Sequence, residues 1–123
     1  MNKSPYLYRV VLKHQWHEAL KDDKGHIPLS PLDEKTGVVH LSKKEQVIPT
    51  LTTHFTPDMD TFVLAIHADR IQDQLKWNAV AARNGEIFPH LYRRLTLSDV
   101  ANRYSVNWET SVPSVDFING LND

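Results

Sequence analysis

The sequence predicts an α+β fold: one small domain in which a mixed or antiparallel sheet packs against two or three helices. Its 123 residues are the length of a single domain, and 41% of them are hydrophobic, which is ordinary globular usage. Short segments rich in β-branched and aromatic residues alternate with segments of helical periodicity, and no internal repeat interrupts them. Such an alternation is typical of α+β domains.

The first third of the chain is expected to contain two strands and one helix. Residues 6–12 have the aromatic and β-branched content of a strand, and residues 14–21 can follow as a short helix. The glycine and prolines of residues 22–36 predict a loop. Residues 37–41 then form a second strand.

The middle third is expected to hold a helix, a central strand and a helical turn. The sequence SKKE that begins at Ser42 has the capping-box pattern, so Ser42 is expected to begin a helix that runs toward Phe55. Pro49 predicts a kink or a restart within it. Residues 61–66 are apolar on both faces and predict a central strand, followed by a helical turn over residues 68–75.

The last third is expected to add two strands. Residues 86–92 form the first, and Pro89 within it predicts a sheet edge or a bulge. One helical turn is expected over residues 97–100 and a last strand over residues 104–108. Trp77 lies in apolar surroundings and is expected in the core.

The domain is expected to span residues 1–112, and residues 113–123 are expected to form a flexible C-terminal tail. With 14 Lys and Arg against 15 Asp and Glu, the net charge of −1 argues against a nucleic-acid partner recognised through bulk positive charge. The absence of cysteine excludes disulfides, thiol catalysis and cysteine-ligated zinc. No apolar run is long enough for a membrane span, and the N-terminus has no signal-peptide core, which together favour a cytoplasmic protein without membrane contact. No feature predicts the oligomeric state.

His40 and Ser42 form a first candidate site. Side chains alternate across a strand, so both face away from Val39 and Leu41, at the point where a helix is expected to begin. The free N–H groups of a helix start suit phosphate or ribose oxygens. The alternative is structural: Ser42 is only an N-cap, and His40 is a half-buried histidine with satisfied hydrogen bonds.

A second candidate site lies in residues 86–94. Alternation places Phe88, His90 and Tyr92 on one face, a suitable lining for a flat heterocycle and a sugar. The alternative is a half-buried strand whose polar groups bond to backbone. Arg93 and Arg94 suggest an anion site beside it. His40 and His90 could also share a metal, but no tight His-x-x-x-His spacing supports this, so no metal is expected.

Ordered motifs along the chain resemble the bacterial family called domain of unknown function 952. They begin with a strand containing Tyr8-Arg9-Val10 and a helix containing Trp16, and continue with Gly37 to Ser42 and Glu45-Gln46-Val47. A hydrophobic strand, Leu75-Lys76-Trp77 and Phe88-Pro89-His90-Leu91-Tyr92 follow in the family's order, over about residues 6–108. The chain is therefore identified as a member of this family.

The resemblance implies a fold like that of the ADP-ribosyltransferase superfamily, with NAD as a possible substrate or another small nucleotide-like ligand in a cleft. His40, His90 and Glu86 are the implied catalytic residues. The ligand would be held by seven side chains: Arg9, His40, Ser42, Phe88, His90, Tyr92 and Arg93. Two readings stay open, an enzyme that transfers ADP-ribose or cleaves NAD, and a non-catalytic module that only binds a nucleotide or small molecule.

Overall fold

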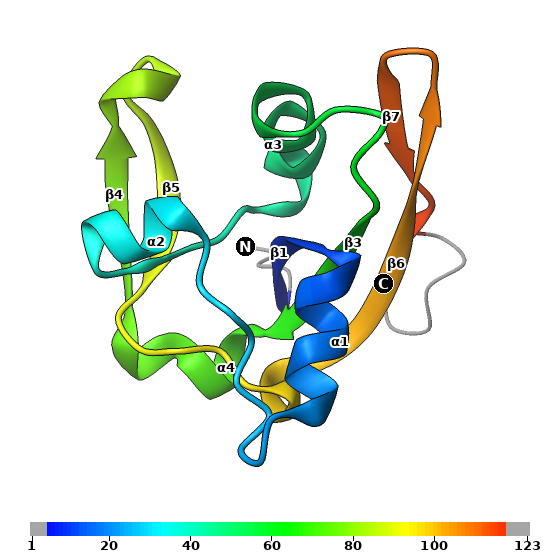
Figure 1. The fold of residues 1–123 in the computed structure, drawn as a ribbon. Helices are drawn as coiled ribbons and strands as arrows, with labels where there is room; N and C mark the ends of the chain where they lie inside the picture. Colours follow the sequence, from blue (N-terminus) through cyan, green and yellow to red (C-terminus); the bar gives the residue numbers. More distant parts are fainter. Residues whose placement is uncertain (1–4, 118–123) are drawn as a thin grey trace.

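Two antiparallel sheets and four α-helices make up the computed structural model, which describes residues 5–117 (Figure 1). This confirms the predicted α+β class, with one sheet and one helix more than the sequence predicts. The α-helices are α1 (Lys13–Lys21), α2 (Pro31–Thr36), α3 (Val47–His54) and α4 (Ala68–Ile71). The strands are β1 (Tyr6–Leu12), β2 (Val39–His40), β3 (Thr61–His67), β4 (Leu75–Val80), β5 (Glu86–Leu91), β6 (Val100–Glu109) and β7 (Val112–Val115). Short 3₁₀ turns cover Lys44–Gln46, Gln72–Gln74, Ala81–Arg83 and Leu97–Asp99.

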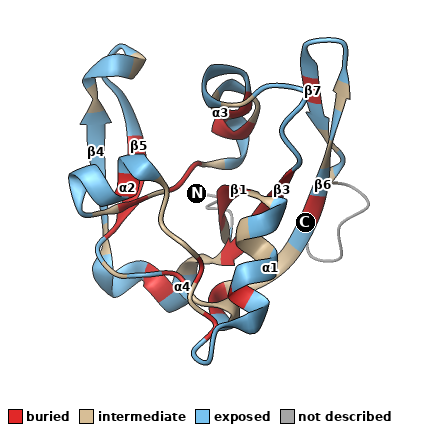
Figure 2. Ribbon diagram, viewed as in Figure 1, coloured by how far each residue is buried: buried red, intermediate tan, exposed pale blue. Residues whose placement is uncertain are grey.

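The larger sheet has the strand order β1-β3-β6-β7 and carries the core. β3 lies between β1 and β6, which confirms its prediction as a central strand, and six of its seven residues are buried. Apolar residues fill both of its faces, as expected for a strand covered on both sides. Figure 2 shows the buried positions concentrated on β1, β3 and the segments packed against them.

The smaller sheet has the order β2-β5-β4, so β5 is its central strand rather than an edge. Pro89 has no N–H group to donate, but its carbonyl still accepts a hydrogen bond from Leu41 N. The other residues of β5 keep their pairing with β4, so the sheet accommodates the proline. β4 and β5 form a hairpin that closes at Asn84 and Gly85, both with positive φ. Trp77 on β4 is 48% exposed, so its prediction as a core residue is wrong.

The helix expected from Ser42 begins later than predicted. Ser42 makes a backbone bridge with Tyr8 on β1, and the chain passes through a 3₁₀ turn before α3 starts at Val47. This restart places Pro49 in the first turn of α3, where its missing N–H costs no helical hydrogen bond. Ser42 is therefore not an N-cap.

Residues 31–36, predicted as loop, form the short helix α2. Ser30 is its N-cap: the Ser30 hydroxyl accepts a hydrogen bond from Asp33 N (3.1 Å), and Asp33 Oδ2 accepts one from Ser30 N (3.0 Å). Pro31 is the first helical residue, and Gly37 ends the helix at a φ of 82°.

At the other end of the chain, β7 pairs with β6, so the domain boundary predicted at residue 112 falls at the start of a strand. Residues 118–123 of the predicted tail lie outside the described residues.

Candidate functional site

The smaller sheet brings His40 and His90 together. The two residues are direct cross-strand partners on β2 and β5. Their ring centroids lie 5.0 Å apart at an interplanar angle of 83°, an edge-to-face contact. The His40 side chain is 25% exposed, whereas His90 is 6% exposed. The pair therefore consists of one accessible imidazole and one buried imidazole.

His40 is held by a buried carboxylate that sequence analysis did not identify. His40 Nδ1 lies 2.8 Å from Asp33 Oδ1, and the His40 backbone N–H donates to the same oxygen at 3.1 Å. Arg9 of β1 forms an ion pair with Asp33 Oδ2 and donates a hydrogen bond to the His40 carbonyl at 2.8 Å. Asp33 is thus surrounded by donors from α2, β1 and β2.

These donors keep Asp33 ionised. Burial alone would raise its pKa, but the His40 hydrogen bond, the Arg9 charge and the Ser30 N–H together hold the pKa of Asp33 well below its usual range. A carboxylate can only accept hydrogen bonds, so the proton between the two groups belongs to His40 Nδ1. His40 therefore presents Nε2 as its second, unoccupied ring nitrogen, in the orientation that Asp33 fixes.

His90 is a neutral partner. Burial lowers the pKa of His90, and the nearby His40 lowers it further, while the backbone of Phe88 offsets part of the effect. His90 Nδ1 is buried and has no hydrogen-bond partner among residues 5–117. An unsatisfied buried nitrogen costs free energy.

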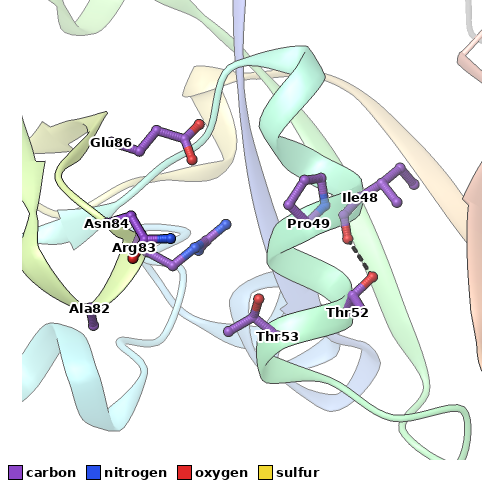
Figure 3. Close-up of a pocket in the computed structure, with 8 residues that line it drawn as sticks. All are labelled: Ile48, Pro49, Thr52, Thr53, Ala82, Arg83, Asn84 and Glu86. Atoms are coloured by element: carbon purple, nitrogen blue, oxygen red, sulfur yellow. Dashed lines mark hydrogen bonds between the residues drawn. The ribbon is translucent and has the colours of Figure 1, made fainter.

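The face of the smaller sheet that carries the two histidines continues along β5 through Phe88 to Glu86. At its far end, a pocket of about 550 Å³ lies between the β4–β5 hairpin and α3. In Figure 3 the side chains of Arg83 and Glu86 extend from the hairpin toward α3. The lining residues are Ile48, Pro49, Thr52, Thr53, Ala82, Arg83, Asn84 and Glu86.

Glu86 lies away from the histidine pair. Glu86 lies four positions before His90 in β5, which is about 13 Å along the strand at about 3.3 Å per residue. One of its carboxylate oxygens accepts a hydrogen bond from Gln46 Nε2 at 2.8 Å, and the same Gln46 nitrogen donates to the Ile87 carbonyl. Glu86 therefore stands at the pocket between the hairpin and α3 and does not contact the imidazoles.

The other predicted binding residues occupy different positions. The Ser42 hydroxyl is buried and lies 3.1 Å from the Thr50 hydroxyl of α3, which joins that helix to the end of β2. Phe88 is buried beneath the Arg83 guanidinium, and Tyr92 is about half exposed beneath Lys76. The Arg9 guanidinium is paired with the Asp33 carboxylate.

Arg93 is not brought to the histidine pair by any contact. Its guanidinium forms two hydrogen bonds of 2.9 Å to Asp99 and donates to the carbonyls of Arg70 and Arg94. Both arginines predicted to meet a phosphate, Arg9 and Arg93, therefore have their charge compensated by a buried aspartate.

Two further features concern other classes of site. A hollow of about 780 Å³ runs beside α1 and is lined by His14 and His17, but it contains none of the predicted site residues. Within residues 5–117 no three His, Asp or Glu side chains are grouped so as to hold a metal ion. No helix in this range is long and apolar enough to cross a membrane.

The fold and site define a small α+β domain in which a histidine pair lies on the same sheet face as Glu86, a residue that lines the pocket between the β4–β5 hairpin and α3. Residues 10–103 match the family model described as "Protein of unknown function (DUF952)", and the chain belongs to this family. The chain is similar to protein CC0527 from Caulobacter crescentus, whose crystal structure shares 31% identity and a TM-score of 0.78, covering 89% of this chain and 93% of that one. The solution NMR structure of the same protein gives 30% identity and a TM-score of 0.76, covering 90% and 93%. No curated protein matches the chain.

Proposed function

We propose that the protein binds a small nucleotide-like ligand at the sheet face that carries His40 and His90. The observation that carries the proposal is the Asp33–His40 pair, in which a buried carboxylate orients an accessible imidazole. A purely structural histidine needs no such orientation of its outward nitrogen. The unpartnered Nδ1 of the adjacent His90 adds a second polar group whose hydrogen bonding the described residues leave incomplete.

The surroundings favour a ligand with hydroxyl groups and a flat ring. His40 Nε2 accepts a hydrogen bond from a ribose hydroxyl in its neutral form and donates one when protonated. Phe88 supplies an aromatic surface on the same sheet face, two residues from His90. These groups are the combination that pockets for nucleosides use: an apolar wall with a few oriented polar atoms.

The Asp33–His40 pair also supports a chemical step, which we propose as cleavage of NAD or transfer of its ADP-ribose. In this step the bond between nicotinamide and ribose breaks, and nicotinamide leaves with the bonding electron pair. Water or an acceptor hydroxyl attacks the ribose carbon, and its proton passes to His40 Nε2. Asp33 then stabilises the imidazolium that forms.

One observation favours binding without this chemistry. A carboxylate near the ribose would stabilise the positive charge that develops when the bond to nicotinamide breaks. Glu86, the implied catalytic acid, bonds to Gln46 about 13 Å along the strand from His90. The non-catalytic nucleotide-binding module is therefore the second candidate function.

Calorimetric titration with NAD and ADP-ribose, together with an assay for released nicotinamide, tests both candidates. We expect ADP-ribose to bind the wild-type protein, and His40→Asn to weaken it about tenfold or more, because a hydrogen bond to an oriented group is lost. His17→Asn is the matched control, since His17 is exposed on α1 and lines the other hollow.

The outcomes separate the candidates. Binding with nicotinamide release that depends on His40 supports the enzyme, and binding without release supports the module. If neither NAD nor ADP-ribose binds, or if His17→Asn weakens binding as much as His40→Asn does, the proposed function is wrong.

A further inference from the structure

The strongest feature that the proposed function leaves unused is the guanidinium of Arg83. It lies at the tip of the β4–β5 hairpin and points across the pocket toward α3 (Figure 3). Within residues 5–117 it forms no hydrogen bond and no ion pair. This separates it from Arg9 and Arg93, each of which is paired with a buried aspartate.

Arg83 is nevertheless held in place. Its guanidinium carbon lies over the Phe88 ring, 4.6 Å from the ring centroid, in a cation–π contact. This contact holds the group over an aromatic face and leaves its N–H donors without a partner among residues 5–117. A planar guanidinium with free donors matches the oxygens of a phosphate bidentately.

The pocket around Arg83 provides further groups for an anion. Thr53 supplies a hydroxyl from α3 and Asn84 an amide from the hairpin turn. Burial lowers the pKa of His54, at the end of α3, and the nearby Arg83 and His40 lower it further. The repulsion between Arg83 and protonated His54 indicates a positive potential in this region. The negative charge that opposes it in this pocket is Glu86, which is bonded to Gln46.

We propose that Arg83, with Thr53 and Asn84, forms a phosphate subsite in the pocket between the β4–β5 hairpin and α3, so that the natural ligand carries a phosphate or diphosphate group. This inference rests on the proposed function, because it assigns the sugar and ring of that ligand to the His40–His90 end and its phosphate to the hairpin end. Phe88 belongs to both ends, with its ring beneath Arg83 and its position two residues from His90.

The test compares three probes by calorimetry: ADP-ribose, pyrophosphate and adenosine, which lacks phosphate. We expect Arg83→Gln to weaken ADP-ribose and pyrophosphate about tenfold to a hundredfold, the loss that a charge-assisted hydrogen bond gives, and to leave adenosine unchanged. Arg83→Lys keeps the charge but not the bidentate geometry and should show a smaller loss.

Arg103→Gln is a matched control. Arg103 also forms cation–π contacts, 4.5 Å from the Phe62 centroid and 5.6 Å from that of Trp16, but it lies on β6. Arg103→Gln therefore removes one charge and its aromatic contacts without changing a pocket residue. The melting temperature of each variant shows that a change in affinity is not a change in folding.

A second readout follows His54 by NMR. A bound phosphate compensates the charge of Arg83, so saturating pyrophosphate should raise the pKa of His54 in the wild-type protein and not in Arg83→Gln. The titratable and charged groups that act on His54 are Arg83 and His40.

The outcomes are distinct. If adenosine and ADP-ribose bind and Arg83→Gln behaves like Arg103→Gln, the phosphate subsite is wrong and the proposed function stands. If pyrophosphate alone binds, in an Arg83-dependent way, the subsite stands and the nucleotide proposal is wrong. If no probe binds, both are wrong.

Discussion

Two buried arginine–aspartate pairs serve different ends in this molecule. Asp33 and Asp99 are 1% and 3% exposed, each is paired with an arginine, and each has its pKa lowered against the effect of burial. Each also closes a capping box at the start of a short helical element. Both aspartates accept a hydrogen bond within their own turn, Asp99 from Thr96 and Asp33 from Ser30. The difference is a further partner of Asp33, the imidazole of His40.

This comparison shows how to distinguish a structural ion pair from a functional one. Arg93 also donates from its two terminal nitrogens to the carbonyls of Arg70 and Arg94, so the pair joins α4 to the segment before β6. Arg9 and Asp33 instead fix the orientation of a side chain that is one-quarter exposed. A buried arginine–aspartate pair can therefore contribute to a binding site only where it orients a side chain that solvent can reach.

The largest effect is expected from Asp33→Asn. The substitution leaves the Arg9 charge buried without compensation, and breaking a buried pair costs about 3–5 kcal/mol. Urea denaturation should show this loss in the free energy of unfolding, and calorimetry should show weaker ADP-ribose binding because His40 loses its orientation.

A double variant sharpens that result. Arg9→Met with Asp33→Leu replaces the pair with apolar side chains and should recover part of the stability, but not the binding. The recovery is partial because the N–H groups of Ser30 and His40 lose Asp33 as their acceptor. Recovery of both would show that the pair has no role in the site.

A smaller effect is expected from Asp99→Asn. Arg93 is about one-third exposed, so water can compensate its charge, and we expect a loss of about 1–3 kcal/mol in the free energy of unfolding. The affinity for ADP-ribose should equal that of the wild-type protein. A loss of affinity comparable to that of Asp33→Asn would remove the distinction between the two pairs.

The smallest effect is a difference in pH dependence. Both aspartates have lowered pKa values, so each contributes stability above the unfolded pKa near 3.8 that is lost as the pH falls through the folded value. His90 adds a second pH range in which stability is lost. Its pKa is lower in the folded protein than in the unfolded chain, so the unfolded chain binds the proton first as the pH falls below about 6.5. The free energy of unfolding should therefore decrease below about pH 6.5, with a shallower slope in His90→Gln. Equal slopes in the two proteins would contradict a buried neutral His90.

The parts of the fold that sequence predicts correctly are those with local signals. β1 and β3 have continuous β-branched and aromatic content, and their observed bounds agree closely with the prediction. β4 was not predicted, because four of its six residues are exposed and LKWNAV lacks a buried face; only the Asn84-Gly85 turn that follows indicates a hairpin. α2 is not predicted because Pro28 and Pro31 indicate a loop. Ser30, Pro31 and Gly37 are nevertheless the N-cap, the first helical residue and the C-cap of this helix.

The candidate site likewise has a part that local sequence signals predict and a part that they do not. Strand alternation predicts which face of each strand carries His40 and His90, and the pairing of β2 with β5 brings their rings together. Alternation within a strand carries no information about Asp33 or Arg83, which lie on a helix and at a hairpin turn. Their contacts depend on how α2 and the hairpin pack, over separations of 24 residues for Arg9 and Asp33 and 7 residues for Asp33 and His40.

The most direct test of the account is a titration of the histidine ring nitrogens with ADP-ribose, followed by ¹H–¹⁵N NMR. In the free protein His40 should carry its proton on Nδ1, the nitrogen that faces Asp33. Added ADP-ribose should shift the ring signals of His40 and His90 and leave those of His14 and His17, beside α1, unchanged. A His40 proton on Nε2, or a ligand response confined to His14 and His17, would contradict the central claim that the Asp33-oriented imidazole forms a ligand site.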